Sequence, residues 1–165
     1  MLKNKLAIIG GSGLYNIEGL SNVESLKIKT PWGDPSDELT KASFKSKEVI
    51  FLPRHGRGHF ISPTKINFRA NIDALKQLGV TDIVSISAVG SLKEDLEPGM
   101  FVIVDQFIDR TFARNKTFFD DDIVAHVSMA KPTSEGLMNA CEESIKSENI
   151  QYKRGATYLV MEGPQ

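Results

Sequence analysis

Three short apolar segments of this chain each run directly into glycine, serine or basic residues, and this pattern constrains the fold most. Residues 6–9 are followed by Gly-Gly-Ser-Gly, residues 49–52 by Pro-Arg-His-Gly-Arg-Gly-His, and residues 82–90 by a serine. Short apolar runs bounded by turn-forming residues are typical of buried strands. Each of the three turns is therefore expected to lie at the end of a strand.

Segments with helical spacing separate some of these strands. Apolar residues recur at near-helical intervals over residues 64–78, and Gly79 stands where a helix C-cap belongs. A second helix is expected from a cap at Thr133 or Ser134 to about residue 147. Further strands are expected at residues 23–28, 38–44, 100–104 and 157–161, with a surface excursion at 109–133.

This alternation predicts an α/β fold, a mixed central sheet with flanking helices, in a single domain that covers residues 1–165. In such folds ligands bind at the carboxyl ends of the strands. The turns at residues 10–13, 54–59 and 87–91 would then lie close together and could surround one small anion.

Composition narrows the function further. The chain has 165 residues and a net charge of -1, so no overall field would recruit nucleic acid or an anionic membrane. Cys141 is the single cysteine, which excludes an internal disulfide and fits a reducing compartment. No segment has the roughly 20 apolar residues that span a bilayer. We expect a cytoplasmic protein that binds neither nucleic acid nor membrane.

The basic turn after residue 52 carries the strongest sign of a ligand. Arginine makes bidentate, charge-assisted hydrogen bonds to phosphate, so Arg54 predicts a phosphate site. A solvated loop is the alternative. His55 and His59 have the spacing of a helical metal site, but Gly56 and Gly58 disfavour a helix there, and no metal site is expected.

The glycine-rich turn at residues 10–13 is ambiguous by itself. Asn16 stands where a dinucleotide-binding fingerprint has its last glycine, and the Gly-Lys-Ser/Thr ending of a P-loop is missing. The turn either binds an anion through Ser12 or only reverses the chain. Ser87 lies within an apolar segment, and a buried hydroxyl there would need a partner that phosphate could provide.

Six motifs together resemble the methylthioadenosine branch of the trimeric purine nucleoside phosphorylase family. The most specific are Thr-Pro-Trp-Gly-Asp-Pro-Ser at 30–36 and Asp-Gln-Phe-Ile-Asp-Arg-Thr at 105–111. The resemblance covers the whole chain in the right order, and the other motifs are at 8–14, 54–57, 88–92 and 162–165.

The resemblance implies phosphorolysis of S-methyl-5'-thioadenosine to adenine and 5-methylthioribose 1-phosphate, a step of purine and methionine salvage. It implies no cofactor or metal, with inorganic phosphate as co-substrate. Arg54 would grip two phosphate oxygens and His55 would donate from a ring nitrogen. His126 matches a residue of the methylthio pocket of a neighbouring subunit, which implies a homotrimer. The residues that would bind phosphate are Ser12, Arg54, His55, Ser87 and Ala88.

The family's base-reading residues follow the Glu-Gly-Pro-Gln motif at 162–165, with which this chain ends. No catalytic residue is therefore assigned, and the chain is expected to be the N-terminal portion of a longer protein, truncated before its base-binding part. Alone it should show weak or no catalysis. Two other functions stay open, a purine nucleoside phosphorylase acting on inosine, guanosine or methylthioinosine, and a non-catalytic phosphate-binding remnant.

Overall fold

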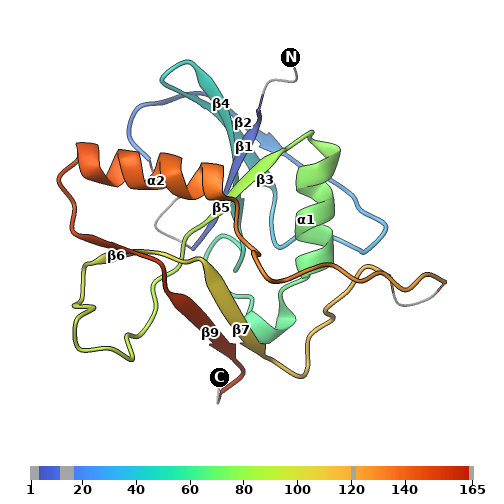
Figure 1. Cartoon of the computed structure of the whole chain (residues 1–165). Helices are drawn as coiled ribbons and strands as arrows, with labels where there is room; N and C mark the ends of the chain where they lie inside the picture. Colours follow the sequence, from blue (N-terminus) through green and yellow to red (C-terminus); the bar gives the residue numbers. More distant parts are fainter. Residues whose placement is uncertain (1–3, 12–16, 120–121, 164–165) are drawn as a thin grey trace. The chain divides into compact units, whose positions relative to one another are not determined.

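The computed structural model describes residues 4–11, 17–119 and 122–163, which form two compact units (Figure 1). The first unit comprises the described part of Met1–Ser87 together with Asn115–Phe118, and the second comprises Ala88–Arg114 and the described part of Phe119–Gln165. The single domain over residues 1–165 that the sequence suggests stays a prediction. Among the described residues, no helix is long and apolar enough to cross a membrane.

The first unit is built on a five-stranded mixed sheet with the strand order β2-β3-β4-β1-β5. β1 runs parallel to both β4 and β5, whereas β3 is antiparallel to β2 and β4. The sheet and its helices confirm the predicted α/β class. The elements of this unit are β1 (Leu6–Gly10), β2 (Leu20–Leu26), β3 (Leu39–Phe44), β4 (Lys47–Pro53), a 3-10 turn (Pro63–Lys65), α1 (Phe68–Gln77) and β5 (Asp82–Ser85).

Both faces of the central strands are apolar, which explains the uninterrupted apolar runs in the sequence. On one face, α1 packs Ala74 and Leu75 against a buried cluster that includes Ile50 and Leu52 of β4. On the opposite face, Val49 and Phe51 pack with Ala42 of β3. β4 is therefore the centre of the core, and its end at Pro53 is firmly placed.

The helix α1 ends as the sequence predicts. Gly79 has a left-handed φ of +73°, and its N–H donates to the Lys76 carbonyl while the Val80 N–H donates to Leu75. This pair of bonds is a Schellman motif. The helix begins later than expected, because Pro63–Lys65 forms a separate 3-10 turn and Asn67 caps α1 by accepting from the Ala70 N–H.

The prediction of a long buried strand at residues 82–90 is wrong in its length and burial. β5 ends at Ser85 and is only half-buried, with β1 as its partner in the sheet. The Ile86 N–H still donates to Ile9, but β1 ends one residue later at Gly10, so the ladder has no further partner there. Ser87 is consequently exposed.

The second unit contains two parallel strand pairs and one helix. β6 (Phe101–Ile103) pairs with β8 (Tyr152–Arg154), and β7 (Gln106–Arg110) pairs with β9 (Thr157–Met161). The predicted strand at 157–161 and the helix α2 (Glu135–Ser147), capped by Ser134, are confirmed. The apolar pattern did not predict β7 or β8. The excursion predicted at 109–133 begins two residues late, because residues 109 and 110 belong to β7. Between Thr111 and Ser134, the described residues contain no helix or strand.

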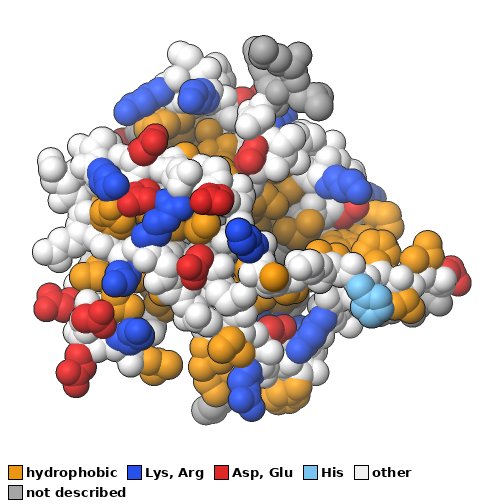
Figure 2. All heavy atoms as spheres, viewed as in Figure 1, with side chains coloured by type: hydrophobic (Ala, Val, Ile, Leu, Met, Phe, Trp, Pro, Cys, Tyr) orange, Lys and Arg blue, Asp and Glu red, His pale blue; other side chains and the backbone are white. Residues whose placement is uncertain are grey.

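Apolar side chains remain at the surface of this second unit. Phe107 and Ile108 of β7 are exposed, as are Leu159 and Met161 of β9. Figure 2 shows apolar side chains on the visible face, among interspersed basic and acidic ones.

Candidate anion-binding site

The carboxyl ends of β1, β4 and β5 meet at one edge of the sheet of the first unit. Gly10 lies opposite Pro53 in the register of β1 and β4, and Ile9 lies opposite Ser85. The parallel ladder continues one step past the strands, because the Arg54 N–H donates to the Gly10 carbonyl at 3.1 Å. The turns that follow these strands therefore start side by side, as the sequence predicts.

Arg54 is the basic side chain at this edge. Its Nη1 donates to the Ile86 carbonyl at 2.9 Å, and its Nε donates to Nε2 of His55 at 3.2 Å. Its Nη2 lies near Gly11, since a Cβ on that glycine would be 3.9 Å away. The guanidinium thus connects all three strand ends, and among described residues these two bonds occupy two of its five N–H groups.

His55 is buried, with 6% of its surface exposed. Its Nδ1 lies 2.9 Å from the Ile61 carbonyl, and the Ile61 N–H donates back to the His55 carbonyl at 3.0 Å. The ring stacks on His59 with centroids 4.3 Å apart. The loop around His55 is therefore fixed at both ends.

A second loop, which contains Ser36 and Asp37, contacts the Arg54 loop and α1. Asp37 accepts a short hydrogen bond from the Arg57 N–H. The neighbouring Ser36 is buried and paired with Asn71 of α1 through two bonds, Ser36 N–H to Oδ1 at 2.8 Å and Asn71 Nδ2 to Oγ at 2.9 Å. A Cβ on Gly56 would come within 3.2 Å of the Ser36 carbonyl oxygen. The Arg54 loop, the loop with Ser36 and Asp37, and α1 therefore pack closely.

Sequence reasoning missed this contact between the loop and α1. The signal was available in Asn71, a polar residue one position after Ala70 on the apolar side of the helix. The motif at 30–36 also contains Trp32. Its ring packs edge-on against Phe118, with centroids 5.3 Å apart, and the Arg69 guanidinium carbon lies 4.5 Å from its ring centroid. Asn67 further ties this loop to α1 by donating to the Trp32 carbonyl at 2.7 Å.

The remaining predicted phosphate ligands are placed less completely. Ser12 lies outside the described residues. Ser87 follows Ile86 directly and is exposed, so its hydroxyl is not the buried group that its apolar surroundings in the sequence suggested. Ala88 is exposed and begins the second unit. Arg54 and His55 are thus brought together, and Ser87 lies next to the residue that Arg54 contacts.

His126 lies in the second unit within residues 122–133, where it is exposed. Its expected role in a neighbouring subunit stays a prediction. Near the end of this unit, Glu162 accepts from the N–H groups of Phe112 and Ala113 at 2.9 and 3.0 Å and forms an ion pair with Arg114 at 3.3 Å. Glu162, the first residue of the Glu-Gly-Pro-Gln motif, thereby organises the turn after β7.

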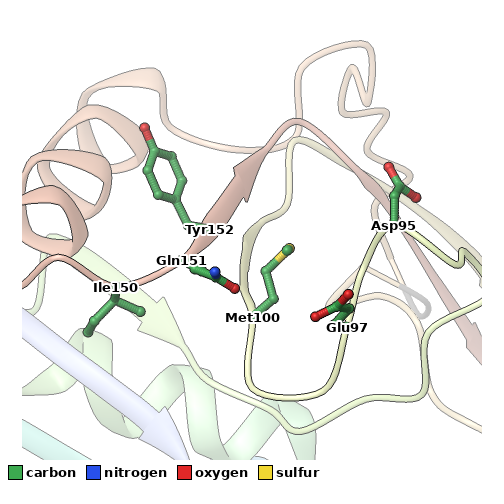
Figure 3. Close-up of a pocket in the computed structure, with 6 residues that line it drawn as sticks. All are labelled: Asp95, Glu97, Met100, Ile150, Gln151 and Tyr152. Carbon is green, nitrogen blue, oxygen red and sulfur yellow. The ribbon is translucent and has the colours of Figure 1, made fainter.

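An open pocket of about 450 Å³ in the second unit contains none of the predicted ligands (Figure 3). Two carboxylates, Asp95 and Glu97, stand on its rim, and they would repel phosphate. The Tyr152 side chain points toward α2, where its hydroxyl donates to Glu142 at 2.7 Å. The sheet edge is therefore a better candidate for the anion site than this pocket. The pocket is lined by Asp95, Glu97, Met100, Ile150, Gln151 and Tyr152.

Across the described residues, no group of three or more histidine, cysteine or acidic side chains could hold a metal ion. The charged donor that the structure places at the sheet edge is the Arg54 guanidinium. Such a donor suits a small oxyanion.

The chain is similar to curated proteins over almost its whole length. An S-methyl-5'-thioadenosine phosphorylase of Rhodospirillum rubrum is 56% identical over 160 residues, which cover 97% of this chain and 54% of that protein. The enzyme of the same name from Cereibacter sphaeroides is 55% identical over 99% of this chain and 57% of its own length. The chain thus spans little more than half the length of these relatives.

Solved structures give the same result. A methylthioadenosine phosphorylase from an antarctic soil metagenomic library superposes with a TM-score of 0.94 at 48% identity, over 98% of this chain and 57% of that one. The methylthioadenosine phosphorylase of Schistosoma mansoni, in complex with tubercidin, gives 0.92 at 34% identity, over 99% and 66%. The sequence model of the phosphorylase superfamily matches residues 5–165, and the chain belongs to this superfamily.

Proposed function

We propose that the protein is an S-methyl-5'-thioadenosine phosphorylase and that this chain supplies its phosphate site. The reaction would break the C1'–N9 bond of the nucleoside and join a phosphate oxygen to C1'. Adenine would leave with the bonding electrons and take up a proton, giving 5-methylthioribose 1-phosphate. The proposal needs no metal or organic cofactor, because phosphate itself is the nucleophile.

The observation that carries the proposal is the fixed position of Arg54 at the meeting point of three strand ends. Its guanidinium is oriented by the Ile86 carbonyl and by His55, with Nη2 on the side of Gly11. An oriented guanidinium binds a tetrahedral oxyanion without first losing side-chain freedom. The names of the relatives support the choice of nucleoside.

Chemically, the site would act through position and charge. The ribose gains positive charge at C1' as the base departs, and an anionic phosphate held on one face stabilises this charge before it attacks. Arg54 would keep the phosphate in place and in its anionic form. The role of the hydroxyls of Ser12 and Ser87 would be to donate to the remaining oxygens, together with the Ala88 N–H.

The assembly and the compartment belong to the same proposal. We place the protein in the cytoplasm as a homotrimer in which His126 reaches the methylthio pocket of a neighbouring subunit. The exposure of His126 and of apolar residues around it, such as Val124 at 80% and Val127 at 75%, supports a contact with another chain.

A turnover assay tests this function. Adenine release from S-methyl-5'-thioadenosine is measured with and without phosphate, for the 165-residue chain and for a chimera that adds the remaining C-terminal residues of the Rhodospirillum rubrum relative. The chain alone should show weak or no turnover, and the chimera should release adenine only with phosphate. An Arg54→Gln chimera is the matched control.

The substrate panel decides between the open alternatives. Preference of the chimera for inosine, guanosine or methylthioinosine would replace the proposed substrate with a 6-oxopurine nucleoside. Phosphate binding without turnover of any nucleoside, in a chimera that folds, would favour a non-catalytic phosphate-binding protein. Robust adenine release by the 165-residue chain would contradict the expectation that it is inactive alone.

A further inference from the structure

The two ring nitrogens of His55 have opposite hydrogen-bonding duties. Nδ1 lies 2.9 Å from the Ile61 carbonyl, which can only accept, so Nδ1 must carry a proton. Nε2 lies 3.2 Å from Nε of Arg54, which can only donate, so Nε2 must offer its lone pair. These partners together select one form of the ring, the neutral Nδ1–H tautomer.

We propose that His55 is a positioning residue that holds the Arg54 guanidinium in its binding orientation by accepting the Nε–H at Nε2, with its tautomer set by the Ile61 carbonyl. The proposal rests on the phosphate site proposed above and changes the role of one member. A histidine that donated to phosphate from Nε2 would need a proton there and could no longer accept from Arg54.

The surroundings of His55 are built to keep the ring in this orientation. The residue is 6% exposed, and its own carbonyl accepts from the Ile61 N–H, so residues 55 and 61 are joined by a reciprocal pair of bonds. The ring also stacks on His59, with an interplanar angle of 21°. Rotation of the ring would break both contacts at once.

The Arg54 guanidinium is consequently held by two hydrogen bonds from different N–H groups. His55 fixes the Nε–H and the Ile86 carbonyl fixes one N–H of Nη1. These two bonds define the plane of the group and leave the Nη2 edge on the side of Gly11. A lysine at this position would keep the charge but has no counterpart of the Nε–H for His55 to hold.

Two isosteric substitutions separate the duties of the ring. The amide of asparagine can replace Nδ1 as the donor to Ile61 but offers no acceptor at the Nε2 position. The carbonyl oxygen of glutamine can replace Nε2 as the acceptor for Arg54. With phosphate affinity measured by calorimetry on the full chain, His55→Gln should stay within about threefold of the wild type and His55→Asn should lose about tenfold, the range of one charge-assisted bond.

A double-mutant cycle then asks whether His55 acts through Arg54. In an Arg54→Lys background there is no Nε–H to orient, so His55→Asn should cost less than about twofold in phosphate affinity. If the two losses multiply instead, His55 contacts phosphate independently and the proposal is overturned. The same holds if His55→Gln loses as much affinity as His55→Asn.

The tautomer can be observed directly. In a chain labelled with ¹⁵N-histidine, the three histidines give separate ring signals, and those missing from His55→Gln belong to His55. We expect a protonated Nδ1 and an unprotonated Nε2 that persist when inorganic phosphate is saturating. A protonated Nε2 in a chain that binds phosphate would overturn the positioning role alone. Failure of the wild-type chain to bind phosphate would contradict the proposed function, and with it the purpose assigned to His55.

Discussion

Nη1 of Arg54 donates to the main-chain carbonyl of Ile86 across 2.9 Å, and this bond joins the loop after β4 to the loop after β5. The two strands are not neighbours in the sheet, because β1 lies between them. The Arg54 side chain therefore reaches across the carboxyl end of β1. This arrangement places the cation near Gly11, the residue that follows β1.

The buried pair of Ser36 and Asn71 should contribute to stability and to the shape of the site. Asn71→Ala leaves the Ser36 N–H and hydroxyl without their helix partner, and a buried polar group that loses its partner costs ~1–3 kcal/mol. Urea unfolding should show this loss. Lys76→Ala on the exposed side of the same helix is the control, with less than about 0.5 kcal/mol expected. Equal losses in both variants would refute a specific role for the pair.

Gly56 and Gly79 offer a matched test of close packing around the site. Both have left-handed backbones, with φ of +71° and +73°, so alanine costs each about 1 kcal/mol in backbone strain. A Cβ at Gly79 meets nothing within 4 Å, whereas one at Gly56 would lie 2.9 Å from a ring carbon of Phe60 and 3.2 Å from the Ser36 carbonyl oxygen.

Gly56→Ala should consequently destabilise the chain more than Gly79→Ala and should also weaken phosphate binding. Thermal unfolding and calorimetric titration with phosphate measure the two effects. A Gly79→Ala variant that binds phosphate as the wild type does is expected, because Gly79 lies at the far end of α1. Equal stability of the two variants would show that the Gly56 loop can move away from Phe60 and Ser36.

Glu142 should make the contact between α2 and β8 sensitive to acid. Hydrogen bonds from Tyr152, Lys146 and Arg154 lower the pKa of this carboxyl to about 2 from its ordinary value of 4.5. A lowered folded-state pKa contributes stability that is present above the unfolded value and is lost as pH falls from about 4.5 to about 2.

Thermal unfolding of Glu142→Gln should therefore lose less stability between pH 5 and pH 2.5 than the wild type, as the lowered pKa of Glu142 requires. Glu143→Gln on the exposed side of α2 is the control and should keep the wild-type acid response. If Glu142→Gln and the wild type lose the same stability over this range, the carboxyl does not hold α2 to β8 as described.

The apolar pattern predicted the parts of the fold that depend on local sequence. The runs at residues 6–9 and 49–52 became β1 and β4 because both faces of those strands are covered, and Ser134 and Gly79 mark helix ends through local hydrogen bonds. Strands β7 and β8 were missed because they are short or polar and form only through pairing with distant residues. β5 is shorter than predicted for the same reason, because its length depends on where its partner β1 ends.

The candidate site divides in the same way. Arg54 was predictable because a cation directly after a buried strand must face the ligand-binding edge of a parallel sheet. The partners that orient it were not predictable, because the carbonyls of Ile61 and Ile86 carry no signal of their own in the sequence. The exposure of Ser87 likewise follows from the end of a ladder and not from its apolar neighbours.

The most direct test of the account is a calorimetric titration of inorganic phosphate into the wild-type chain and into Arg54→Gln and Arg57→Gln. Both variants remove one positive charge from the same loop, but Arg57 is exposed and is held through its main-chain N–H, which donates to Asp37. Loss of two charge-assisted bonds predicts a phosphate affinity at least about tenfold weaker in Arg54→Gln, with Arg57→Gln within about threefold of the wild type. Equal phosphate affinity in all three chains, or no saturable binding to the wild type, would contradict the assignment of this sheet edge as the phosphate site.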